Sequence, residues 1–202
     1  MNEKTISFTS QGLTLAGVLR WPTGFKAGER RPALVVLHGF GSNKGAENVL
    51  GPCAEIEAMG YITLRFDMPG CGDSEGPRGH LICMEQVQAT LDAVTFMMGE
   101  PSVQTDAIGL IGSSFGAAVA VYAGAVDARV AGVISSGGWG HGENKCKGQH
   151  PTPGAWDKFK RMLQEGREQK AKTGTTIMVH RFDIVPIPPH LRGGLPPTAV
   201  MQ

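Results

Sequence analysis

Alternating and continuous apolar segments divide the first two thirds of the chain into predicted strands and helices. Alternation over residues 5–9 and 13–20, joined by Ser10-Gln11-Gly12, predicts an antiparallel hairpin at a sheet edge. Continuous apolar runs, typical of strands buried on both faces, occupy residues 32–37, 61–66, 107–111 and 130–135. Helical spacing covers residues 45–59, 83–98 and 117–123. The pattern predicts an α/β fold of three layers, with a mostly parallel twisted sheet after the N-terminal hairpin.

The composition changes after Ser136. Glycine, histidine, lysine and proline dominate as far as Gly154, and residues 156–172 follow as a predicted basic helix with Trp156 and Phe159 on one side. Residues 176–186 have the pattern of a further strand that ends in D-x-V-P. We therefore expect a core at residues 1–136, and at residues 137–202 a cap insertion and a truncated C-terminal end in the same domain.

The segment G-x-S-x-G at residues 112–116 lies between a predicted strand and a small-residue helix. A serine at such a sharp turn is typical of a hydrolase nucleophile. Glycine is needed at positions 112 and 116 because a side chain two residues from the nucleophile would collide across the turn. This places Ser114 as the candidate nucleophile and leaves Ser113 to fill the inner side of the turn.

Two other predicted strands also open into glycine-containing loops, H-G-F-G at residues 38–41 and D-x-x-G-x-G-D-S at residues 67–74. The carboxyl ends of parallel strands meet at one sheet edge, where such folds bind ligands. With G-x-S-x-G, these motifs resemble in order and spacing the α/β-hydrolase superfamily, nearest to the small bacterial serine esterase, peptidase and dienelactone-hydrolase-like branch. The resemblance spans roughly residues 5–135. Dienelactone hydrolases carry cysteine at the nucleophile, so serine at 114 implies ester, thioester or amide substrates.

The resemblance also implies an oxyanion hole formed by the backbone N–H groups of Phe40 and Phe115. Their side chains would matter only for shape and substrate contact, and the alternative is that Phe40 merely covers the core. His38 is expected to be a local hydrogen-bonding residue of the loop rather than the catalytic base.

The catalytic acid and base follow the nucleophile in hydrolases of this class. Asp183 is the candidate acid, but His190 lies only seven residues beyond it in a Pro-rich stretch. The alternative bases His141, His150 and His180 are more typical of surface or cap residues. We therefore expect a chain that lacks its last third, with two core strands and a closing helix absent. Artificial or natural truncation, a processed chain and an atypical family member all remain open explanations.

This expectation has two consequences. The 202-residue chain should be nearly inactive, because it lacks the base. The strand at residues 130–135 should become an exposed edge that self-associates or is covered by residues 175–185.

Composition excludes several other classes. The net charge of +1 gives no footprint for nucleic acid, and no apolar run approaches the roughly 18 residues that span a bilayer. The start of the chain has no signal-peptide pattern, so a cytoplasmic location and four free thiols are expected.

No cofactor or metal is expected either. Residues 39–45 do not form a phosphate-binding loop, no dinucleotide fingerprint follows the first parallel strand, and His141, Cys146 and His150 match no zinc spacing. The sequence predicts a serine hydrolase of small-molecule esters. The alternative is a non-catalytic relative that binds a small hydrophobic ligand or a partner chain.

Overall fold

The computed structural model describes residues 2–188 of the chain. It divides into two compact units, Met1–Trp139 and Gly140–Gln202. Each unit is described by itself below.

A six-stranded sheet forms the centre of the first unit, in the order β1-β2-β4-β3-β5-β6. The strands are β1 (Glu3–Ser10), β2 (Leu13–Arg20), β3 (Arg31–Leu37), β4 (Ile62–Phe66), β5 (Val103–Ser113) and β6 (Val130–Ser136). The β1–β2 and β2–β4 pairs are antiparallel, and the three remaining pairs are parallel. The predicted hairpin at the sheet edge and the mostly parallel sheet are confirmed.

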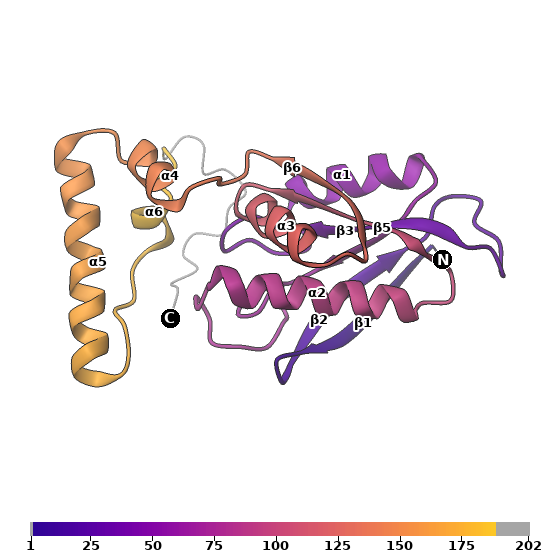
Figure 1. Ribbon diagram of the computed structural model, residues 1–202, viewed down its shortest axis with the longest axis horizontal. Helices are drawn as coiled ribbons and strands as arrows, with labels where there is room; N and C mark the ends of the chain where they lie inside the picture. The colour runs from indigo at the N-terminus through magenta and orange to yellow at the C-terminus, as the bar shows by residue number, and fades with distance from the viewer. Residues whose placement is uncertain (1, 189–202) are drawn as a thin grey trace. The chain divides into compact units, whose positions relative to one another are not determined.

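Three helices cover the two faces of this sheet: α1 (Glu47–Ala58), α2 (Cys83–Gly99) and α3 (Phe115–Val126) (Figure 1). Successive side chains of a strand point to opposite faces, and β3 illustrates the division. Val35 and Leu37 belong to the core cluster shared with α2 and α3, whereas Val36 packs with residues of α1. The three-layer architecture predicted from the sequence is confirmed.

β6 departs from the prediction of a strand buried on both faces. Its residues 131–136 are all exposed, and Ile134 retains 52% of its accessible surface. The apolar composition correctly predicted that these residues form a strand, but whether a strand is buried depends on the elements that pack beside it. β6 is the last strand in the sheet order, with β5 on one side and contacts to α3. In the described residues it is an open sheet edge.

The second unit contains α4 (Gly142–Gln149), α5 (Pro153–Thr173) and α6 (Arg181–Ile184). The predicted basic helix is α5, which begins with a Thr152 cap and a proline in its first turn and ends at Gly174 in the left-handed conformation. α4 was not anticipated from the sequence. No helix of the described residues is both long enough and apolar enough to cross a membrane.

The strand predicted at residues 176–186 is wrong. The segment runs beside α5 instead, where the Thr176 hydroxyl donates to the Gly166 carbonyl and a Cβ on Gly166 would touch Ile177. It then forms the short α6, capped by the His180 ring, which accepts a hydrogen bond from the Phe182 N–H. Local capping and packing against α5 therefore replaced strand pairing, so this segment adds no strand beside β6. The cap role of residues 137–202 stays a prediction.

Candidate functional site

The turn between β5 and α3 holds Ser114 in an unusual backbone conformation. Ser114 has φ of 54° and ψ of −117°, and only Gln11 shares a positive φ among the non-glycine residues of the described chain. Its N–H donates to the Ser136 carbonyl at 2.9 Å, which ties the turn to the end of β6. Strained backbone of this kind persists where the surrounding structure enforces it, and it is concentrated at active sites.

Two glycines permit this turn, as the sequence predicted. A Cβ at position 112 would collide with the carbonyl of Gly116 and lie 2.7 Å from the Ala117 nitrogen. A Cβ at position 116 would collide with the carbonyl of His38 and lie 2.7 Å from that of Leu37. Because the obstacles are backbone atoms, no rotamer change can relieve them. The absence of both side chains lets α3 start directly against the end of β3.

The two adjacent serines have different surroundings. The Ser113 hydroxyl accepts a hydrogen bond of 2.9 Å from the Asn48 amide of α1, a contact between residues 65 positions apart that no sequence pattern predicts. The Ser114 hydroxyl has no hydrogen-bond partner among residues 2–188. Ser113 is thus tied to the scaffold, and the candidate nucleophile is Ser114.

The loop after β3 lies against this serine. A Cβ built on Gly39 would be 3.6 Å from the Ser114 Cβ, so the glycine allows the loop to approach the serine closely. The Phe40 ring packs edge-on against that of Phe115 at 5.5 Å, and the Phe115 ring contacts Trp139 at 5.6 Å. Phe115 is the first residue of α3, where a backbone N–H has no acceptor within its own helix. The assignment of the Phe40 and Phe115 N–H groups to an oxyanion hole stays a prediction.

His38 is a structural residue of the loop. It is buried, its Nε2 accepts a hydrogen bond of 3.1 Å from the Met68 N–H, and its Nδ1 lies 2.8 Å from the Gly39 carbonyl. Since Nε2 accepts, the proton is on Nδ1. Burial lowers the pKa of His38 and keeps the ring neutral. Both nitrogens are occupied, as expected for a residue that is not the base.

The D-x-x-G-x-G-D-S segment folds around the carboxylate of Asp67, which is completely buried. One oxygen accepts the Lys44 N–H at 2.6 Å, and the other accepts both the Lys44 ammonium at 2.6 Å and the Asp73 N–H at 2.8 Å. A Cβ on Gly72, whose φ is 47°, would overlap this carboxylate. Burial by itself lowers the pKa of Lys44, but hydrogen bonds to Asp67 and Asp73 outweigh it and raise that pKa.

The candidate acid and bases of the second unit have local roles. His141 caps α4, His180 caps α6, and the two ring nitrogens of His150 face the carbonyls of Cys146 and Asp183. The Asp183 carboxylate is 40% exposed and pairs with Lys158 at 3.1 Å. His190 lies outside the described residues. Within residues 2–188, no three histidine, cysteine or acidic side chains gather as a metal site would require.

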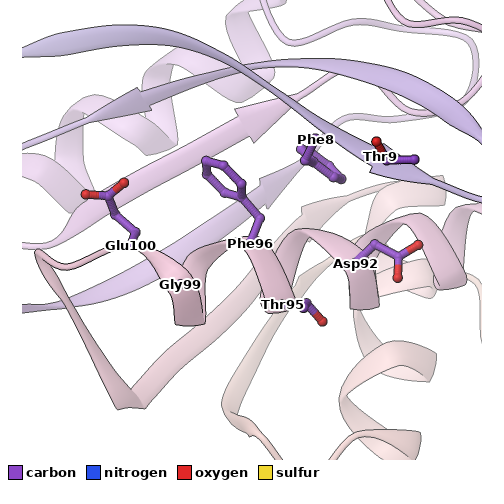
Figure 2. Close-up of a pocket in the computed structure, with 7 residues that line it drawn as sticks. All are labelled: Phe8, Thr9, Asp92, Thr95, Phe96, Gly99 and Glu100. Atoms are coloured by element: carbon purple, nitrogen blue, oxygen red, sulfur yellow. The ribbon is translucent and has the colours of Figure 1, made fainter.

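Two cavities are lined by residues outside the serine turn. An open depression of about 380 Å³ between β1 and α2 has Phe8 and Phe96 side by side and the carboxylates of Asp92 and Glu100 at either end (Figure 2). A groove of about 860 Å³ in the second unit runs between α4 and α5 and includes Trp156. Neither includes a residue of the three sequence motifs.

Comparison with known proteins identifies the family. A family model described as serine aminopeptidase, S33, matches residues 28–179. The chain belongs to this family of α/β hydrolases. The predicted superfamily is confirmed, and the match extends from the loop before β3 past the end of α5.

Three relatives indicate how far the similarity reaches. The chain is 38% identical over 139 residues to thiohydrolase aneE of Aspergillus aculeatus, covering 66% of this chain and 42% of the relative. It is 36% identical over 139 residues to polyketide transferase ATR5 of Stachybotrys chlorohalonatus, covering 67% and 44%. The crystal structure of α/β hydrolase GrgF from Penicillium superimposes with a TM-score of 0.71 at 27% identity, covering 89% of this chain and 58% of that one. The chain spans about half the length of these relatives.

Proposed function

We propose that this protein cleaves small-molecule esters or thioesters through an acyl-enzyme on Ser114. One observation carries the proposal: the positive φ of Ser114 at a strand-to-helix turn that two glycines permit. A strained residue with this surrounding structure is typical of a nucleophile whose hydroxyl must project from the sheet edge.

The reaction follows from that geometry. The Ser114 oxygen adds to the acyl carbonyl, and the negative charge that develops on the carbonyl oxygen is stabilised by the N–H groups of Phe115 and Phe40. Collapse of this tetrahedral intermediate breaks the bond between the acyl carbon and the leaving sulfur or oxygen. The thiol or alcohol leaves with the proton that a general base took from Ser114. Water then releases the acid. The described histidines all have other partners, so we assign no residue to the base.

Two observations support an apolar acyl thioester as the substrate. The rings of Phe40, Phe115 and Trp139 form an aromatic cluster beside the serine turn. Two relatives are named thiohydrolase and polyketide transferase, and a thiol is a better leaving group than an alcohol. Transfer of the acyl group to an alcohol or amine in place of water would use the same acyl-enzyme.

The test compares two neighbouring serines. In a catalytically complete form of the protein, Ser114→Ala should abolish hydrolysis of an acyl N-acetylcysteamine thioester and of a p-nitrophenyl ester, because the nucleophile is lost. Ser113→Ala should keep most of the activity, since its hydroxyl bonds Asn48. Equal loss in both variants would refute the assignment.

A second candidate function, ligand binding without turnover, is favoured by the lack of a hydrogen-bond partner for Ser114 within residues 2–188. A fluorophosphonate separates the two functions, because its covalent attachment requires an activated serine. Mass spectrometry of the adduct at Ser114 supports the hydrolase. An unlabelled protein that still binds apolar ligands supports the second function.

A further inference from the structure

The loop that carries Phe40 is held at both ends by two consecutive residues. At its start, the Met68 N–H donates to the His38 ring at 3.1 Å. At its end, the Asp67 carboxylate accepts both the backbone N–H and the ammonium of Lys44, each at 2.6 Å. The backbone between these anchors, which includes Gly39 beside Ser114, is therefore positioned by residues 67 and 68.

The contacts of Asp67 leave little freedom at this anchor. Its carboxylate has no exposed surface and receives three donors, two of them from Lys44. The ammonium is also largely covered, with 16% of the side chain exposed. A buried, charge-assisted contact of this kind is shorter and stronger than a neutral one. The second partner of the ammonium, the Asp73 carboxylate, is 80% exposed and is expected to contribute little.

We propose that Asp67 and Lys44 are positioning residues of the reaction, which act by fixing the loop that brings the Phe40 N–H to the reacting carbonyl. The inference rests on the proposed function of Ser114. Donors of an oxyanion hole must be in place before the charge develops, and an error of about 1 Å can cost on the order of 100-fold in rate. Substrate binding depends less on this geometry, because the ground-state carbonyl carries less charge.

Lys44→Met is the main variant, because it removes the ammonium and keeps the backbone N–H that bonds Asp67. We expect kcat for the thioester to fall about 10-fold with KM within about twofold of the parent value. Inhibition by phenylboronic acid, whose adduct places an oxygen in the oxyanion hole, should weaken by the same factor. Lys44→Arg should restore most of kcat, since it retains the charge.

Asp67→Asn should lower kcat further, by about 100-fold, because an amide has one acceptor oxygen for three donors. Asp73→Asn is the matched control, since it removes the exposed carboxylate from the same ammonium, and it should leave kcat and KM unchanged.

Several outcomes overturn the inference. It fails when Lys44→Met and Asp67→Asn both retain the parent kcat. It also fails when Asp73→Asn lowers kcat as much as Lys44→Met does. It fails again when circular dichroism shows that Lys44→Met is unfolded, because the loss of kcat must occur with the structure intact. The proposed function fails separately, when the catalytically complete, unsubstituted protein neither turns over the thioester nor takes up fluorophosphonate at Ser114.

Discussion

Replacement of Gly116 by alanine tests the physical basis of the serine turn. In most exposed helical positions this change stabilises a protein, because alanine has the higher helix propensity by about 1 kcal/mol. At position 116 the added methyl group would collide with the His38 carbonyl and lie 2.7 Å from the Leu37 carbonyl. Both carbonyls belong to backbone at the end of β3, so α3 and the strand must separate to admit it.

The magnitude follows from these two opposing effects. Overpacking a close contact costs roughly 1–3 kcal/mol and sometimes more, and two backbone obstacles place this site at the upper end. Subtracting the helix-propensity gain of about 1 kcal/mol leaves a net loss of about 2 kcal/mol. With a urea m-value of about 2 kcal/mol per molar, the unfolding midpoint should fall by about 1 M. Separation of Ser114 from Gly39 should also lower kcat, by about 100-fold per ångström.

The control is Gly99→Ala at the last position of α2, in the same unit. Gly99 is exposed, and a Cβ there meets nothing within 4 Å. That variant should be as stable as the parent protein or more stable by about 0.5 kcal/mol. Urea unfolding followed by circular dichroism measures both. A Gly116→Ala midpoint within about 0.2 M of the parent value would refute the reasoning, because it would mean that the backbone of the turn yields without cost.

Two further predictions concern pH and association. Hydrogen bonds from Arg129 lower the pKa of Asp127 in the folded protein. The pair therefore stabilises the fold at a pH above the pKa of an unfolded Asp, which is about 4. This stabilisation disappears as the pH falls through the lowered pKa of the folded protein. The difference in unfolding free energy between the parent and Asp127→Asn should therefore shrink from pH 6 to pH 3, and a constant difference would contradict it. We also propose that the uncharged open edge of β6 pairs with a second copy, so Ile134→Lys should lower the mass measured by light scattering. A monomeric parent protein would contradict this prediction.

The elements of the core could be predicted because each rests on short-range patterns. Alternation identified the β1–β2 hairpin, and continuous apolar runs identified β3, β4 and β5. The strand-to-helix turn was equally local, since its glycines and Ser114 lie within five residues. The succession of strand, loop and helix then predicted that these strands are parallel neighbours in one sheet, whereas their order in the sheet comes from the structure.

The sequence-based predictions were wrong where contacts with other elements determined the structure of a segment. Residues 176–186 have the composition of a strand, but Gly166 of α5 leaves a surface against which Thr176 and Ile177 pack, and His180 caps a short helix. β6 has the composition of a buried strand, but nothing in the described residues pairs with its outer edge. In both places, contacts with other elements outweighed the intrinsic preference of the residues for a buried strand.

The Lys44 contact with Asp67 shows why the supporting part of the site was missed. The residues around Lys44 do not form a phosphate-binding loop, and the 67–74 motif by itself indicates no physical role for Asp67. Only the folded chain brings the two together across 23 residues, and it does so because Gly72 has no Cβ to occupy the space of the carboxylate. The glycine at 72 therefore permits the buried charge, the charge fixes Lys44, and Lys44 fixes the loop beside Ser114. A motif that contains no predicted catalytic residue thereby positions the loop of Phe40, whose N–H we propose as an oxyanion donor.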